Sequence, residues 1–167
     1  MTVPAFGSQG SDHPTSEVPD AFWLFEHFDD VVAVRDTNPD PMFKCLAAKR
    51  VAFDPDVPSA TYRWSLNVDG DEEKKYPLIH YTAGPTPDAV NAVVNSDTGH
   101  PDTQRFLYTD YETCGILETH YFGNQCILWV PTDLRDSFPE ECLKKHTEIC
   151  GEGVSLYDKN LCGGTQA

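Results

Sequence analysis

Hydrophobic positions in the middle of the chain recur with the period of β-strands. Between residues 61 and 68, apolar Tyr62, Trp64 and Leu66 alternate with polar neighbours, which is typical of a strand with one buried face. Proline, glycine and aspartate separate this segment from seven similar ones, which predicts short strands joined by turns. The eight predicted strands are 31–37, 42–53, 61–68, 76–82, 89–94, 104–111, 114–121 and 126–132. No helical period interrupts the series, so we expect an antiparallel barrel or sandwich.

A helical period precedes the strands and another follows them. Ala21, Leu24, Phe25 and Phe28 recur at i, i+3, i+4 and i+7, which predicts a short helix with one apolar stripe that begins near Pro19. This helix is expected to pack on the core.

The second helix has the clearer boundary signals. Ser137 and Glu140 have the spacing of a capping box, and Pro139 suits a first helical turn. Gly151 stands where a left-handed terminator is expected. The pattern therefore predicts a helix that Ser137 caps and Gly151 ends.

The chain has six cysteines, at positions 45, 114, 126, 142, 150 and 162, without a C-x-x-C pair. An even number at wide spacing indicates three disulfides and an oxidising compartment, most simply the extracellular space. Cys142, His146 and Cys150 follow one another at intervals of four, so the second helix points both sulfurs at the same neighbour. We expect His146 to be packed rather than to bind a metal.

Charge and length restrict the partners. The 167 residues carry a formal charge of −15, which repels nucleic acid and anionic membrane surfaces. No apolar run approaches the length of a transmembrane helix. Residues 1–16 have the composition of a flexible tail, and residues 17–167 are expected to form one domain. We expect a mature, secreted chain whose signal peptide has been removed, since no basic and apolar leader stands at its start.

Sequence motifs of known catalytic sites are missing. The chain has no nucleophile elbow, metalloprotease, Walker or dinucleotide motif, so we do not expect an enzyme, a cofactor or a metal site. The acidic run at 69–73 is expected to be a solvated turn rather than a calcium loop. An eight-stranded barrel has an interior suited to one small ligand.

Several short motifs together resemble a known family. They are Asp-Ala-Phe at 20–22, Val-Arg-Asp-Thr-Asn-Pro at 34–39, Thr-Asp-Tyr at 109–111, Leu-Trp at 128–129, and Phe-Pro-Glu-Glu-Cys at 138–142. In this order, and with these cysteine spacings, they are similar to the tick salivary lipocalins, which include histamine-binding and moubatin-like proteins. The resemblance implies an eight-stranded antiparallel barrel with an N-terminal helix closing one end and a C-terminal helix packed outside.

The resemblance also implies the disulfides Cys45–Cys162 and Cys114–Cys142 and, with them, Cys126–Cys150. Strand alternation agrees with this pairing. If Cys114 and Cys126 point outward, toward the second helix, their strand neighbours Gly115, Leu117, Ile127 and Trp129 point into the barrel.

Members of this family sequester host mediators at the bite. The amine binders resemble one another in inward acids at the positions of Phe28, Gly115 and Ile127, and in a hydroxyl at the position of Leu24. Because apolar residues replace these groups here, the resemblance implies a small hydrophobic ligand instead, a leukotriene or another fatty acid, with a sterol as the nearest variant. Binding it would suppress inflammation.

Other interpretations stay open from the sequence. Other acids, such as Glu73 or Asp36, could form an amine site near the barrel's opening. The acidic loops could instead bind a host protein of the complement system. The side chains at the family's pocket positions could also fill the barrel as ordinary core.

The expected ligand-binding residues lie on the first helix and on the strands. Val31, Ala33 and Arg35 share a face by alternation, so Arg35, aided by Arg105, is the candidate anchor for a carboxylate. The alternative is an outward Arg35 paired with a surface acid. We expect a monomer whose site consists of Leu24, Phe25, Phe28, Val31, Ala33, Arg35, Tyr62, Trp64, Arg105, Gly115, Leu117, Ile127 and Trp129.

Overall fold

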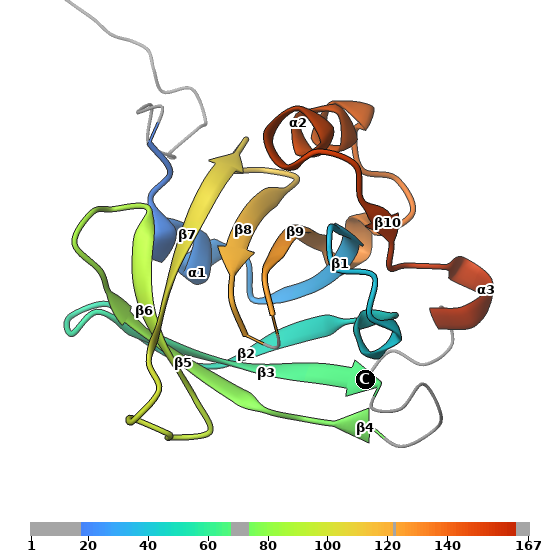
Figure 1. Cartoon of the computed structure of the whole chain (residues 1–167). Helices are drawn as coiled ribbons and strands as arrows, with labels where there is room; N and C mark the ends of the chain where they lie inside the picture. Colours follow the sequence, from blue (N-terminus) through green and yellow to red (C-terminus); the bar gives the residue numbers. More distant parts are fainter. Residues whose placement is uncertain (1–17, 68–73, 122, 163–167) are drawn as a thin grey trace, which may run out of the picture.

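The computed structural model describes residues 18–67, 74–121 and 123–162 (Figure 1). Four predicted features lie wholly or partly outside the described residues: the tail at 1–16, the end of the third strand at Val68, the acidic run at 69–73, and Phe122 in the link between the last two strands.

Eight antiparallel strands form a closed barrel, one of the two architectures that the strand pattern predicts and the one that the family resemblance implies. Neighbouring strands pair in chain order, and pairing of the first with the last closes the ring. The strands are β1 (Asp30–Asp36), β2 (Ala47–Asp54), β3 (Ser59–Asn67), β5 (Leu78–Ala83), β6 (Ala89–Val94), β7 (Asp102–Thr109), β8 (Gly115–Thr119) and β9 (Gln125–Pro131). The short strand β4 (Lys74–Lys75) pairs with β3, and β10 (Val154–Ser155) pairs with β1.

The predicted strand at 42–53 begins too early. A 3-10 turn, η2 (Pro41–Phe43), precedes β2. The Asp40 carboxylate accepts a hydrogen bond from Met42 N–H at 3.0 Å, and Pro41 suits the first position of such a turn. The turn chemistry therefore overrides the apolar character of residues 42–46.

The first predicted helix is confirmed as α1 (Ala21–His27), which Asp20 caps by accepting a hydrogen bond from Trp23 N–H. The C-terminal helix is α2 (Glu140–Cys150), and Gly151 ends it with a φ of 89°, as predicted. None of the helices among the described residues is long and apolar enough to cross a membrane.

The predicted cap of α2 is wrong. Pro139, not Ser137, stands at the N-cap position, and no side chain bonds there. Ser137 N–H donates to Leu134 O at 2.9 Å, so Ser137 belongs to the turn that follows η4 (Thr132–Leu134). A short helix, α3 (Lys159–Cys162), follows β10 and was not predicted.

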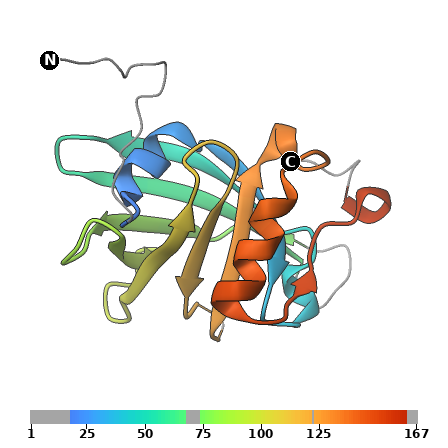
Figure 2. The same ribbon diagram turned by 90° about the horizontal axis from the view of Figure 1, so that it is seen from above.

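The hydrophobic core has two parts, one inside the barrel and one between the barrel and α2. In Figure 2, α2 lies along the outer face of the barrel beside β9. The outer part consists of Val32, Val34, Cys114, Ile116, Leu128, Val130 and Cys142. Cys142 belongs to α2, and the other members come from the outward face of β1, β9 and β8 with the residue before it, Cys114, which confirms the predicted alternation there.

Three disulfides join the C-terminal segment to the barrel, in the pairing that the family resemblance implies. They are Cys45–Cys162, Cys114–Cys142 and Cys126–Cys150. Two of them hold α2 against β9 and the start of β8, near each end of the helix.

Candidate ligand-binding site

Helix α1 covers one end of the barrel, which we call the α1 end. The hydroxyl of Tyr62 lies 2.6 Å from Phe28 O and 3.1 Å from Phe25 O, and it donates to these carbonyls at the end of α1. Burial raises the pKa of Tyr62 above its usual value, so the hydroxyl keeps its proton. Arg50 Nη1 donates to Phe25 O and Glu26 O, at 2.6 and 2.8 Å. These donors satisfy carbonyls that the helix itself leaves free.

The Thr-Asp-Tyr motif at 109–111 holds the start of α1. Asp20 N–H donates to the Tyr111 hydroxyl at 3.0 Å, and the Tyr111 ring packs edge-on against Trp23 with ring centroids 5.2 Å apart. The Asp110 carboxylate accepts from the N–H groups of Thr113 and Cys114, at 2.7 and 3.1 Å. Burial opposes ionisation of Asp110, but these and other hydrogen bonds outweigh it and hold the pKa of this carboxyl below its usual value. The motif therefore orders the loop against which α1 docks.

A small apolar cavity lies beneath α1. Its volume is about 50 Å³, which is room for a few atoms only. It is lined by Leu24, Phe25, Phe28, Val31, Ala48, Tyr62, Trp64, Tyr81, Phe106, Gly115, Leu117 and Trp129. No wall residue carries a charge. Two of the three positions that are acidic in the amine binders, Phe28 and Gly115, belong to this wall.

Aromatic side chains fill most of this end. The Phe25 ring lies 4.8 Å from the Tyr81 ring and 5.7 Å from the Phe106 ring, measured between centroids. A Cβ at Gly115, in contrast, would meet no atom closer than 3.8 Å. The barrel at this end is therefore largely packed core, and Gly115 on its wall leaves room for a small side chain.

Nine of the thirteen predicted site residues lie on the wall of this cavity. Ala33 and Ile127 are buried in the same core cluster but do not line the cavity. Ala48, Tyr81 and Phe106 line it and were missed, although alternation along their strands would have identified them.

Arg35 does not point into the barrel. A β-bulge between Ala33 and Arg35 shifts the register against β9, so that Arg35 pairs with Leu128, whose side chain packs in the outer core. Arg35 lies beside Gly153 and close enough to His146 on α2 to affect its titration. The predicted inward placement was wrong because strict alternation does not hold across a bulge.

Arg105 also points outward. It is exposed, and its Nη1 forms an ion pair with the Asp88 carboxylate at 3.1 Å. Its neighbours on β7, Gln104 and Phe106, are the buried ones. The two arginines expected to hold a carboxylate are therefore both outside the barrel.

The opposite end of the barrel is more open. A groove of about 380 Å³, the mouth groove, is lined by Met42, Leu66, Lys75, Tyr76, Pro77, Asn95 and Tyr121. Trp64 lies between this groove and the inner cavity, since its ring contacts both Tyr121 and Trp129, with centroids 5.6 Å away in each case.

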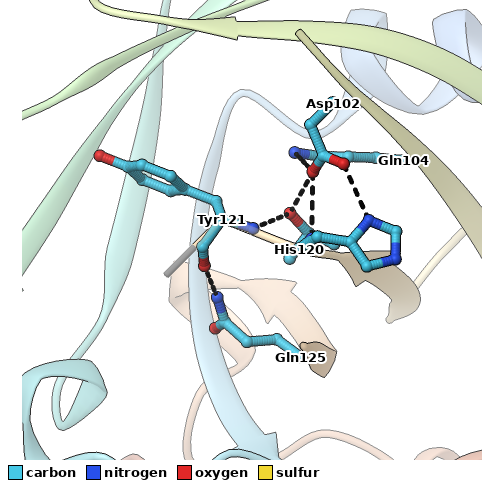
Figure 3. A network of polar contacts seen from close by, with 6 residues as sticks. Asp102, Gln104, His120, Tyr121 and Gln125 are labelled. Carbon is cyan, nitrogen blue, oxygen red and sulfur yellow. Dashed lines mark hydrogen bonds and ion pairs between the residues drawn. The ribbon is translucent and has the colours of Figure 1, made fainter. Parts of the chain in front are cut away.

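Toward the mouth, the barrel interior carries a set of polar side chains, which we call the polar layer: Asp102, Gln104, Thr119 and Gln125. The Asp102 carboxylate accepts hydrogen bonds from Gln104 Nε2 at 3.2 Å and from Thr119 Oγ1 at 3.3 Å. It also accepts from the backbone N–H and the Nδ1 of His120, at 3.0 and 2.8 Å (Figure 3). Gln125 Nε2 donates to Tyr121 O.

The polar layer was not predicted from the sequence, although a signal for it was present. The outward Cys126 places Gln125 inward, and the inward Leu117 places Thr119 inward two residues later. Asp36, one of the acids considered for an amine site at the opening, is not exposed there, and its Oδ2 has no hydrogen-bond partner among the described residues. Its carboxylate is fully buried and accepts from Asn38 N–H and Cys126 N–H, both at 3.2 Å.

Comparison with known proteins identifies the family. The family model described as tick histamine binding protein matches residues 28–163. No functionally curated protein matches the sequence.

Solved structures share the fold at low sequence identity. The AM182 protein in complex with serotonin is 13% identical, with a TM-score of 0.62 over 89% of this chain and 95% of that one. Japanin from Rhipicephalus appendiculatus bound to cholesterol is 13% identical, with a TM-score of 0.57 over 80% and 95%. Lobster apocrustacyanin A1 is 12% identical, with a TM-score of 0.57 over 87% and 89%. With a family match over most of its length and this barrel, the chain belongs to the tick histamine-binding protein family of lipocalins.

Proposed function

We propose that this protein is a secreted, monomeric scavenger that holds one small hydrophobic host mediator inside its barrel and thereby suppresses inflammation. The observation that carries the proposal is the apolar character of the α1 end, where the positions of the amine binders' acids hold Phe28 and Gly115 on the cavity wall and Ile127 in the surrounding core. A buried ammonium at this end would lack the anions that offset its desolvation. The three disulfides fit an extracellular protein.

The size of the ligand requires rearrangement of the barrel's interior. Sites for small molecules typically measure about 300–1,000 Å³, whereas the inner cavity measures about 50 Å³. A lipid would therefore extend past Trp64 into the mouth groove of about 380 Å³, or displace rings such as Phe25.

Among the hydrophobic mediators, a leukotriene or fatty acid would need a cation for its head. Arg35 and Arg105 point away from the barrel, so the candidate becomes Lys75, which lines the mouth groove. A sterol or another uncharged lipid needs no such partner and is favoured by this geometry.

One observation favours a biogenic amine as the second candidate. Asp102 lies among the inward residues near the mouth, and AM182, a protein of similar fold, is described in complex with serotonin. Asp102 already accepts four hydrogen bonds, so a biogenic amine is a weaker candidate than a hydrophobic ligand.

Extraction of the purified protein with organic solvent, followed by mass spectrometry, tests the proposal together with calorimetric titration of histamine and serotonin. We expect a co-purified lipid, or binding of added lipids, and at most weak amine binding. Submicromolar binding of histamine with no binding of any lipid would refute the proposal.

A further inference from the structure

Two buried amide oxygens in the polar layer have no hydrogen-bond partner among the described residues. They are Gln104 Oε1 and Gln125 Oε1, on side chains that are 1% and 2% exposed. A buried polar group without a partner is rare, because leaving it unsatisfied costs about 1–3 kcal/mol. Both side chains therefore point to a partner that the described residues do not supply.

The orientation of both amides follows from their other contacts. Gln104 Nε2 donates to the Asp102 carboxylate and Gln125 Nε2 donates to Tyr121 O. A carboxylate and a carbonyl can only accept, so the nitrogen of each amide must face them. The remaining atom is then an oxygen in both residues, and both need a hydrogen-bond donor.

The two oxygens belong to one layer of the barrel, next to the apolar interior. Thr119 pairs with Gln125, and the register that pairs Arg105 with Glu118 places Gln104 beside Thr119 on the other side. On each strand, the residue two positions closer to α1, about 6–7 Å away, is apolar. These residues are Phe106, Leu117 and Ile127. A molecule whose body occupies the apolar interior can therefore place its head in this layer.

The charges and hydrogen bonds around the two amide oxygens determine which kind of head group can bind there. A carboxylate offers only acceptors and would lie near the negative Asp102, so it is disfavoured. Asp102 already accepts four hydrogen bonds, and the two open groups are neutral oxygens, which compensate a buried ammonium poorly. An uncharged donor such as a hydroxyl satisfies an amide oxygen without that desolvation cost.

We propose that Gln104 and Gln125 bind the head of the ligand, and that this head is an uncharged hydrogen-bond donor, a hydroxyl, with the apolar body directed toward α1. The inference rests on the proposed function and names the ligand class: lipid alcohols rather than lipid acids. Gln104 and Gln125 are thus specificity-determining residues.

The test uses four probes with one chain length and different heads: 1-dodecanol, methyl dodecyl ether, dodecylamine and dodecanoate. Binding is followed by calorimetry and by the fluorescence of Trp64 and Trp129, which lie in the barrel. We expect the alcohol to bind about tenfold more tightly than the ether, because only the alcohol can donate a hydrogen bond to an amide oxygen that otherwise has no partner. The amine and the carboxylate should both bind more weakly than the alcohol.

The variants Gln104→Leu, Gln125→Leu and their combination identify the residues responsible. The combined variant should bind the alcohol and the ether equally, within about twofold, while its ether affinity stays near that of the wild type, which shows that the barrel still folds. Thr103→Val is the matched control, because Thr103 is the exposed neighbour of Gln104 on β7. It should keep the preference for the alcohol.

The outcomes separate this inference from the proposed function. Equal binding of alcohol and ether by the wild type overturns the inference and leaves a lipid-binding barrel, with water the simplest partner of the two oxygens. Tighter binding of the amine, or a preference that survives both substitutions, also overturns it. Failure of all four probes to bind counts against the proposed function itself.

Discussion

The two ends of the barrel satisfy their polar groups in opposite ways. At the α1 end, Tyr62 and Arg50 donate to the carbonyls that α1 leaves free, and the side chains that face inward are apolar. Toward the mouth, the interior carries a carboxylate and two glutamines, and the oxygens of both amides lack a partner among the described residues.

This difference indicates a division of tasks along the barrel axis. The α1 end is built like an ordinary core, in which side-chain donors pair with the carbonyls at the end of α1 and aromatic rings fill the space. The mouth end keeps buried polar groups that lower stability, a pattern that is typical of functional sites. A ligand that enters this barrel therefore has a defined direction, with its apolar part toward α1.

The largest expected effect concerns Asp36, which ends β1 near the mouth. Burial raises the pKa of its carboxyl to about 7, against opposing hydrogen bonds from the N–H of Asn38 and Cys126. The native state thus keeps a proton that the unfolded chain releases near pH 3.8. Between these values the native state binds more protons, so this group's contribution to the free energy of unfolding falls as pH rises, by at most about 4 kcal/mol.

Asp36→Asn removes this titration, and its denaturant-unfolding curves between pH 4.5 and 7.5 should show a smaller fall in stability than those of the wild type. His146 acts in the opposite sense. Burial lowers its pKa, so its contribution to stability is lost as pH falls through about 6.5. Because both proteins contain His146, the difference between their profiles isolates Asp36. Parallel profiles would show that Asp36 is ionised in the native state, so that burial at the mouth end does not keep its carboxyl protonated.

The next effect tests the α1 end. Tyr62→Phe removes the donor to Phe28 O and Phe25 O, so we expect the free energy of unfolding to fall by about 1–3 kcal/mol. Tyr76→Phe is the control, since Tyr76 is 50% exposed at the mouth and should change stability by less than about 0.5 kcal/mol. Urea unfolding of both variants provides the measurement. Equal effects would contradict the view that the α1 end carries the closing hydrogen bonds.

A third change separates binding from stability at the α1 end. A side chain at Gly115 meets no atom closer than 3.8 Å at its Cβ, so Gly115→Val should fold normally and occupy the cavity. We expect lipid affinity to fall at least about tenfold, or about 1.4 kcal/mol, with unchanged or slightly higher stability. Gly115→Ala fills less space and should have a smaller effect. Unchanged affinity in the valine variant would mean that the ligand does not reach this end.

The regular parts of this molecule could be predicted from the sequence. Eight segments with strand character are enough for a closed barrel, and alternation correctly distributes Cys114, Gly115 and Leu117 between its two faces. The resemblance to a known family added the disulfide pairing, which six cysteines alone leave undetermined.

The irregular parts could not be predicted in the same way. The capping-box spacing of Ser137 and Glu140 is real, but Pro139 and a hydrogen bond to Leu134 O place the start of α2 later. The partner of each amide in the polar layer depends on distances between strands, which spacing along the chain does not contain.

Arg35 is the case in which one local irregularity changes a functional conclusion. Alternation from Val31 and Ala33 places it inside the barrel, whereas the bulge before it places it beside α2. Arg35→Leu should therefore change the affinity for dodecanoate and for cholesterol by less than about twofold, which is below 0.5 kcal/mol. Lys75→Gln is the comparison, because Lys75 lines the mouth groove and its loss should weaken binding of the acid alone. If calorimetry shows that Arg35→Leu selectively weakens binding of dodecanoate, the arginine reaches the ligand after all, and its placement on the outer surface of β1 is wrong.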